Sequence, residues 1–311
     1  RDVWYSTSYL LDRKQSMNGC AKKRFENYKQ QPLEFVFDKS FTGKLSQFGL
    51  DPNRRTPSGI KAAIIREKGT NGEREMAYML YLAGFDVKDV TMTDLISGRE
   101  TLEDINMVVY CGGFSNSDVL GSAKGWAGSF LFNPKAKAAL DNFYAREDTL
   151  SLGVCNGCQL MMELGLITPE DKKKGKMLHN DSHKFESNFL GVTVPMNRSV
   201  MFGSLSGSKL GIWVAHGEGK FSLPYPEDHY NVVLKYSYDE YPGNPNGSDY
   251  SVAGIASQDG RHLAMMPHLE RACFPWENAY YPLDRKEEDQ ITPWMEAFVN
   301  ARKWVEANRK K

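Results

Sequence analysis

The sequence lacks long apolar runs and net charge, and both absences limit what the chain can be. No stretch approaches the ~18 consecutive apolar residues that a membrane-spanning helix needs, and no signal-peptide pattern opens the chain. Lys and Arg together number 39, as do Asp and Glu, so the excess positive charge typical of nucleic-acid-binding proteins is missing. We expect a cytoplasmic protein with a small substrate and with neither a nucleic-acid nor a membrane partner.

Cysteine and histidine are also scarce. Five cysteines in 311 residues are an odd number spread over a long chain, which argues against a secreted disulfide framework and favours reduced thiols. A zinc site would need two further ligands near the Cys-x-x-Cys of Cys155 and Cys158, but the six histidines are dispersed and no second such pair exists. We expect no metal or cofactor in this chain.

The order of apolar runs and helical patterns predicts an α/β fold. A boundary is placed near Ser58, after an amphipathic helical stretch over residues 1–31 and a following segment that alternates briefly as a strand. Beyond it, strands are expected at 61–67, 85–92, 106–113 and 149–154, and helices at 70–84, 135–147 and 155–167. Asn71 is the candidate N-cap of the first of these helices, and Gly84 is its candidate C-cap. Such alternation indicates a doubly wound, mostly parallel sheet whose ligands sit at the carboxyl ends of the strands. Short strands over 185–265 suggest antiparallel additions, and a helix at 293–307 closes the chain.

The stretch LGVCNGCQLM lies where a predicted strand gives way to a helix. Gly153 and Gly157 flank Cys155 at minus two and plus two, which makes G-V-C-N-G a cysteine version of the G-x-S-x-G nucleophile elbow. A thioredoxin-like redox pair would show the same Cys-x-x-Cys, and two buried core cysteines are the plainest alternative. The flanking glycines favour Cys155 as a nucleophile and Cys158 as a packing residue.

A thiolate nucleophile needs a base, and the base needs an orienting group. The stretch MMPHLER places His268 and Glu270 two positions apart after a predicted strand, so a carboxylate-to-imidazole hydrogen bond is plausible. The strand end VVYCGGFS offers a turn at Gly112-Gly113 whose amide faces the elbow, beside the amide of Asn156. A plain tight turn is the alternative for the two glycines.

With these features in this order, the chain resembles class I, triad-type glutamine amidotransferase domains. The resemblance implies that Cys155 attacks the side-chain amide of glutamine and that His268, oriented by Glu270, shuttles protons. It also implies that the amides of Gly113 and Asn156 hold the oxyanion. Ammonia then leaves, and water cleaves the thioester to give glutamate.

Further fragments resemble the glutaminase portion of large single-chain amidotransferases of purine synthesis: CGGFSNSDVLGSAKGWAGSFLFN, HNDSHKFE, HGEGKF, YPGNPNGS and PWMEAFVNARKW. This resemblance implies that residues 1–57 are the tail of a synthetase region plus a linker and that 58–311 form the glutaminase domain. The start at Arg1 is then expected for a piece of a longer polypeptide. Ammonia would pass to the synthetase domain, and ATP and Mg²⁺ are expected only in the full-length enzyme.

The same resemblance implies a set of substrate contacts. Gln159 would contact the bound glutamine, and Asn180, Ser182 and His216 would line the pocket or an interface. Each has an ordinary structural alternative, such as a helix cap or a turn residue. Two other functions stay open: a peptidase or γ-glutamyl hydrolase of the same architecture that transfers no ammonia, and a module without catalytic activity.

Overall fold

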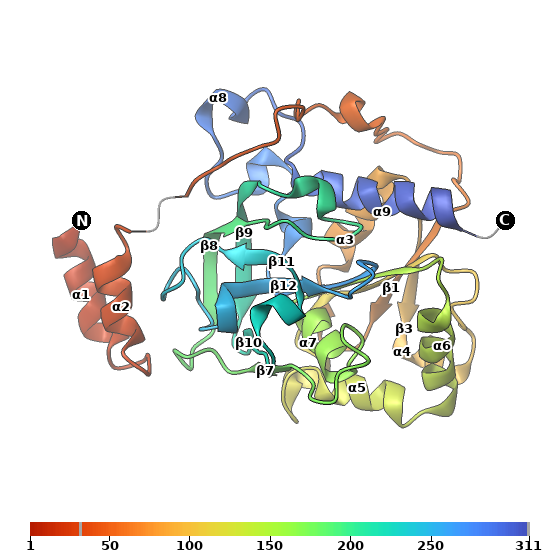
Figure 1. Ribbon diagram of the computed structural model, residues 1–311, viewed down its shortest axis with the longest axis horizontal. Helices are drawn as coiled ribbons and strands as arrows, with labels where there is room; N and C mark the ends of the chain where they lie inside the picture. Colours follow the sequence, from red (N-terminus) through yellow and green to blue (C-terminus); the bar gives the residue numbers. More distant parts are fainter. Residues whose placement is uncertain (31–32, 310–311) are drawn as a thin grey trace.

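A large sheet runs through the molecule and divides into two halves by strand direction (Figure 1). The residues described by the computed structural model, 1–30 and 33–309, form a nine-stranded sheet in the order β3-β1-β4-β6-β13-β12-β11-β8-β9. The strands β3, β1, β4, β6 and β13 run parallel and are called the parallel half. From β13 onward each strand pairs antiparallel with the next, and β12, β11, β8 and β9 are called the antiparallel half.

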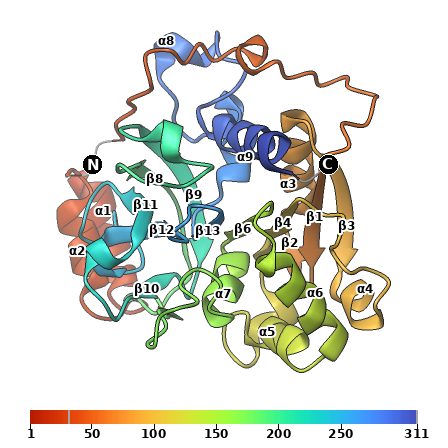
Figure 2. The same cartoon turned by 45° about the vertical axis from the view of Figure 1, so that its right-hand side comes forward.

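The parallel half confirms the predicted fold class. Its strands are β1 (Lys61–Arg66), β3 (Asp86–Thr91), β4 (Met107–Tyr110), β6 (Leu150–Val154) and β13 (His262–Met265). Four of them, β1, β4, β6 and β13, carry runs of consecutive buried residues, because helices cover both faces. Figure 2 shows α3 and α9 on one face and α5, α6 and α7 on the other.

Helices flank these strands, and some of them begin at a capping side chain. They are α3 (Glu73–Ala83), α4 (Met92–Ser97), α5 (Lys124–Leu131), α6 (Pro134–Ala145), α7 (Asn156–Glu163) and α9 (Trp294–Asn308), with a short α8 (Leu283–Lys286) before the last. In α6, the side chain of Asn133 accepts hydrogen bonds from two first-turn amides, and proline takes the first helical position. The predicted final helix is confirmed by α9.

The start of α3 differs from the prediction. Asn71, expected as its N-cap, lies in the short strand β2 (Thr70–Asn71), which pairs with β5 (Gly112–Gly113). The helix begins instead after Gly72, whose φ of 85° favours glycine. The pairing of β2 with β5, which is distant in sequence, therefore outweighs the local preference of Asn71 to cap a helix.

The antiparallel half consists of β8 (Glu186–Thr193), β9 (Lys209–His216), β11 (Asn231–Tyr236) and β12 (Val252–Ala256). A separate small sheet pairs β7 (Lys176–Leu178) with β10 (Lys220–Ser222). Antiparallel additions were predicted over 185–265, but β13 is an exception because it runs parallel to β6. Short buried runs do not encode strand direction, and the open edge of β6 could take a neighbour of either direction.

The amphipathic stretch over residues 1–31 forms two helices, α1 (Asp2–Asp12) and α2 (Cys20–Asn27), called the N-terminal hairpin. The chain reverses at Asn18 and Gly19, which both have positive φ. Residues 31 and 32 lie outside the described residues. The strand expected next is reduced to one bridge between Val36 and Lys209. Figure 1 shows the hairpin beside β8, away from the parallel half.

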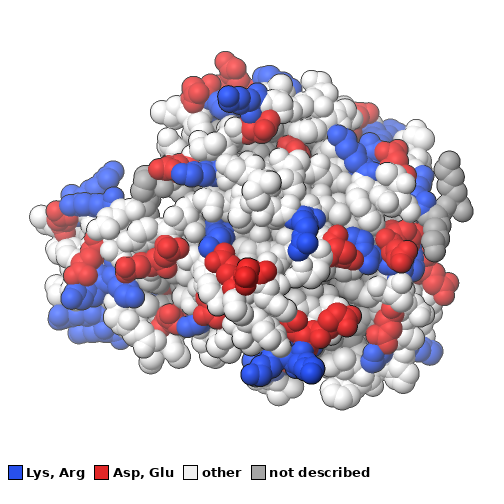
Figure 3. Space-filling view, viewed as in Figure 1, with Lys and Arg blue, Asp and Glu red and all other residues white. Residues whose placement is uncertain are grey.

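Charges of both signs are intermingled over the face drawn in Figure 3, in keeping with the equal numbers of basic and acidic residues. Among the described helices, none combines the length and the apolar character that a membrane crossing requires.

Candidate active site

Cys155 occupies the sharp turn between β6 and α7. Its backbone is strained, with φ of 53° and ψ of −108°, outside the helical range. A Cβ atom on Gly153 would lie 2.5 Å from the carbonyl oxygen of Gly157, and one on Gly157 would lie 2.1 Å from that of Tyr110. Side chains cannot fit at either position, so the two glycines are required by the turn, as the elbow motif predicted.

The His-x-Glu pair forms the expected hydrogen bond. Nδ1 of His268 lies 2.6 Å from Oε1 of Glu270, and both side chains are buried. The backbone amide of His268 donates to the carbonyl of Trp213 at 2.9 Å, which ties the segment to β9. Because Nδ1 faces the carboxylate, the other ring nitrogen, Nε2, is left for the nucleophile.

Gly112 shows how close the nucleophile and the base come. A Cβ atom placed there would lie 2.8 Å from Cε1 of His268 and 3.2 Å from Cβ of Cys155. The two side chains therefore meet over a glycine that has no room for a methyl group. The amide of Cys155 also donates to the carbonyl of Met265 at 2.9 Å, extending the β6–β13 ladder to the nucleophile itself.

The electrostatics of the pair favour a thiolate. Burial alone would raise the pKa of the Cys155 thiol, but the neighbouring imidazoles of His216 and His268 outweigh it and lower the pKa to about 6. Burial likewise opposes the charged form of His268, yet Glu270 and Cys155 raise its pKa to about 10. Burial raises the pKa of the Glu270 carboxyl less than His268 lowers it. At neutral pH the thiolate and the imidazolium are therefore the favoured forms.

The second cysteine has the opposite electrostatics. Cys158 is completely buried in α7, and burial raises its thiol pKa well above the usual value. All five cysteines are free thiols. Among the described residues, no group of three or more His, Cys, Asp and Glu side chains is placed to hold a metal ion.

The Gly-Gly strand end packs against the elbow, as expected for an oxyanion site. Gly113 has φ of 116° and belongs to β5. The side-chain oxygen of Asn156 accepts a hydrogen bond from the amide of Ser115 at 3.0 Å, and its nitrogen donates to Asp118 at 3.2 Å. The loop after β5 is thereby held onto the first turn of α7. That the amides of Gly113 and Asn156 bind an oxyanion stays a prediction.

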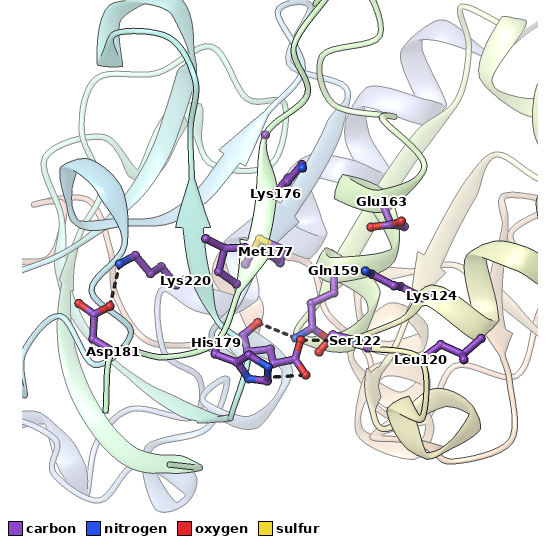
Figure 4. Close-up of a pocket in the computed structure, with 14 residues that line it drawn as sticks. Leu120, Ser122, Lys124, Gln159, Glu163, Lys176, Met177, His179, Asp181 and Lys220 are labelled. Atoms are coloured by element: carbon purple, nitrogen blue, oxygen red, sulfur yellow. Dashed lines mark hydrogen bonds and ion pairs between the residues drawn. The ribbon is translucent and has the colours of Figure 1, made fainter. Parts of the chain in front are cut away.

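Gln159 lines a cavity of about 580 Å³ beside α7 (Figure 4). Its side-chain nitrogen donates to the carbonyl of Glu218 at 2.7 Å, and its oxygen accepts from Asn156 at 2.9 Å. Further residues of the cavity wall are Lys124, Glu163, Lys176, Asp181 and Lys220. Cys155 and His268 are not part of this wall, and they are only 4% and 2% exposed. Gln159 therefore connects the cavity wall to Asn156, the residue after the nucleophile.

Asn180 and Ser182 are used inside the protein. Asn180 is fully buried and bonds to backbone atoms of Lys184, His216 and Gly219, so it shapes the turn after β9. Ser182 is also fully buried and donates to Glu186 at 2.6 Å. The geometry does not support direct contact of these two side chains with the substrate. It indicates that they stabilise the surrounding backbone and Glu186.

His216 ends β9, next to Ala215, whose carbonyl oxygen lies 3.7 Å from the sulfur of Cys155. That His216 lines the pocket or an interface stays a prediction. Sequence reasoning missed the residues that hold it, Asn246 and Tyr236, as well as the part played by Gly112 and Glu218. Asn246 lies in the fragment YPGNPNGS, but the resemblance assigned it no role, and no motif marks Tyr236.

Residues 59–305 match the family described as CobB/CobQ-like glutamine amidotransferase domain, and the chain belongs to this family. Its curated relatives include the probable chloroplastic/mitochondrial phosphoribosylformylglycinamidine synthase of Arabidopsis thaliana, 40% identical over 99% of this chain and 23% of the relative. The phosphoribosylformylglycinamidine synthase of Homo sapiens is 40% identical over 98% of this chain and 24% of its own length. The chain thus spans about a quarter of these relatives, and the predicted resemblance is confirmed.

Solved structures agree with the fold. PurLQS from Thermotoga maritima matches with a TM-score of 0.58 and 26% identity, over 81% of this chain and 99% of that chain. A putative GMP synthase subunit from Thermoplasma acidophilum matches with a TM-score of 0.52 and 16% identity, over 82% and 98%. The second likeness is one of fold alone.

Proposed function

We propose that this chain is the glutaminase part of a phosphoribosylformylglycinamidine synthase. The observation that carries the proposal is the strained Cys155, with its lowered pKa, beside the His268–Glu270 pair in a member of a glutamine amidotransferase family. A thiolate held at a strand-to-helix turn and paired with an oriented imidazole is suited to acyl transfer.

The proposed reaction has two stages. The Cys155 thiolate attacks the side-chain carbonyl carbon of glutamine, and the amides of Gly113 and Asn156 bind the resulting oxyanion. His268 gives its proton to the amide nitrogen, the C–N bond breaks, and ammonia leaves a thioester on Cys155. Water then attacks the thioester and gives a proton to His268, the C–S bond breaks, and glutamate and the thiolate are released.

The ammonia would be used by a synthetase region of the same longer polypeptide, which converts formylglycinamide ribonucleotide (FGAR) to the amidine (FGAM). The length of the relatives supports such a region, because this chain spans only about a quarter of them. We assign ATP and Mg²⁺ to that region and derive no step through them. The role of residues 1–57 as a synthetase tail plus linker, and a cytoplasmic location, remain predictions.

The decisive experiment replaces Cys155 with Ala in the full-length protein. Synthesis with glutamine should fall to background, whereas synthesis with free ammonia should persist. Cys158→Ala is the matched control and should keep most of the glutamine-dependent activity. Persistent glutamine-dependent synthesis in the Cys155 variant would refute the nucleophile assignment.

The rival activities predict other results. A peptidase or γ-glutamyl hydrolase of this architecture would turn over γ-glutamyl peptides faster than free glutamine. A module without activity would not be labelled at Cys155 by a glutamine analogue that carries a diazoketone group. Rapid labelling, together with a preference for free glutamine, is the result we expect.

A further inference from the structure

His216 is a buried histidine whose orientation is fixed from one side. Its Nε2 lies 2.7 Å from Oδ1 of Asn246, and the amide nitrogen of Asn246 donates to the hydroxyl of Tyr236 at 2.9 Å. Because that nitrogen is engaged with Tyr236, the oxygen of Asn246 faces the imidazole and accepts its hydrogen bond. Nε2 of His216 therefore carries a proton.

The position of the ring is fixed by packing as well. A Cβ atom on Gly219 would lie 2.3 Å from Cδ2 and 2.5 Å from Nε2 of His216, so the turn after β9 presses directly on the imidazole. The carbonyl of His216 accepts from Asn180 at 2.8 Å, which holds the backbone of the same turn. The ring has little room to swing away from its place.

The other ring nitrogen of His216, Nδ1, is not used in this network. Nδ1 of His216 is buried and has no conventional hydrogen-bond partner within residues 1–30 and 33–309. The sulfur of Cys155 lies against the end of the same strand, 3.7 Å from the carbonyl oxygen of Ala215. A buried imidazole nitrogen without a partner costs free energy unless it serves the neighbouring group.

We propose that His216 is a second catalytic imidazole, which carries a proton on Nδ1 as well as on Nε2 and donates a hydrogen bond from Nδ1 to the Cys155 thiolate. This inference rests on the proposed function. In this arrangement the sulfur of Cys155 lies between two imidazoles, that of His268 and that of His216. When the C–S bond of the thioester breaks, the electron pair returns to sulfur, and His216 stabilises the departing thiolate while His268 carries the proton taken from water.

The interaction between the two residues is consistent with this role, because His216 lowers the pKa of the Cys155 thiol. The other titratable groups around the sulfur are Cys158 on α7, Tyr236 on β11, and His268 and Glu270 beyond β13. Burial raises the pKa values of Cys158 and Tyr236, so both stay neutral near neutral pH. The thiolate then faces the His268–Glu270 pair and the imidazole of His216.

The test measures the thiolate directly. The ultraviolet absorbance of the protein is compared with that of its Cys155→Ala variant across pH, which gives the midpoint of thiolate formation. His216→Asn should raise this midpoint by about one pH unit, the size expected from losing one hydrogen bond to a charged group. His262→Asn, which removes a buried histidine bonded to Ser151 elsewhere in the sheet, should leave the midpoint unchanged.

An unchanged midpoint in folded His216→Asn protein would overturn the proposal, because a purely structural role lowers stability without shifting the titration. If that variant does not fold, Asn246→Leu decides, since loss of the Asn246 oxygen should raise the midpoint by a smaller amount and no rise contradicts the proposal. In the full-length protein, His216→Asn should lower kcat for glutamine hydrolysis about tenfold with little change in KM.

The two proposals can fail separately. The thiolate midpoint is read without glutamine, so a shift in a protein that releases no ammonia would sink the proposed function and leave the role of His216 intact. Ammonia release with an unshifted midpoint would overturn the role of His216 and leave the proposed function intact.

Discussion

The parallel and antiparallel halves of the sheet contribute to the site in different ways. The parallel half supplies the reacting groups from the ends of its strands, with Cys155 after β6 and His268 after β13. The antiparallel half supplies what surrounds them, namely the His216–Glu218 turn and the Asn246 amide behind it. Backbone geometry at strand ends therefore sets the chemistry, whereas side chains from distant segments set the charge and the cavity around it.

The largest effect is expected where the backbone of the parallel half is tightest. Gly157→Ala would place a methyl group 2.1 Å from the carbonyl oxygen of Tyr110, so either the elbow shifts or the fold weakens. Glutaminase activity should fall at least about a hundredfold, because a small misplacement of a reacting atom is costly. Activity and thermal unfolding are measured together.

The matched control lies in the turn of the antiparallel half. A Cβ atom on Gly217 meets nothing within 4 Å, so Gly217→Ala should keep both stability and most activity. Equal losses in the two variants would show that the comparison between the halves is wrong.

The next largest effect concerns the orienting carboxylate. Glu270→Gln removes the charge that raises the pKa of His268, so the imidazolium and the thiolate both become less favoured. We expect kcat to fall about 10²- to 10⁴-fold, as for loss of the orienting carboxylate in other triads. Steady-state kinetics check this. A wild-type kcat in the variant would show that Glu270 does not orient His268 for catalysis.

The thiolate–imidazolium pair also predicts how stability depends on pH. The folded pKa of His268 is raised to about 10, so its contribution is complete below the usual value of 6.5 and is lost as pH rises through 10. The folded pKa of Cys155 is lowered to about 6, so its contribution is complete above 9.0 and is lost as pH falls through 6. Denaturant unfolding should show Cys155→Ala losing this dependence near pH 6.

Reactivity should separate the two cysteines of LGVCNGCQLM. Alkylation of Cys155 should follow a midpoint near pH 6, while Cys158, buried and with a raised pKa, should stay unmodified in the native protein. Mass spectrometry after brief treatment with iodoacetamide identifies the labelled residue. Equal labelling of both thiols would reopen the redox-pair interpretation.

The smallest effect is expected in the antiparallel half. Ser182→Ala removes a buried hydrogen bond to Glu186 and should cost about 1–3 kcal/mol of unfolding free energy. KM for glutamine should change little, because Ser182 does not reach the cavity. A rise in KM without loss of stability would restore the predicted substrate contact.

Much of the parallel half could be predicted because its signals are local. A few consecutive residues suffice to predict the elbow glycines around Cys155, the strand before them and the His-x-Glu at a strand end. The N-cap of α3 could not be predicted, since Asn71 pairs with Gly112 some 40 residues away. The direction of β13 was missed for a similar reason, because pairing with β6 is a property of the assembled sheet.

The site could be predicted only as far as its motifs extend. Cys155, His268 and Glu270 carry recognisable spacing, and the structure brings the three together. Asn246 lies in the family-like fragment YPGNPNGS, but its role follows only from the hydrogen bond to His216. The segment of Asn180 and Ser182 resembles a family motif, so the sequence predicts that they line the pocket. In the structure both side chains are buried, and their polar atoms bond within the protein.

The hydrogen bond from the amide of Cys155 to Met265 makes the nucleophile the last rung of the ladder between β6 and β13. That amide is bonded between the two central strands, so we expect its hydrogen to exchange with solvent about as slowly as those of the sheet core. Heat should therefore inactivate the protein and unfold it over the same temperature range, with no earlier stage in which a loose loop loses activity alone.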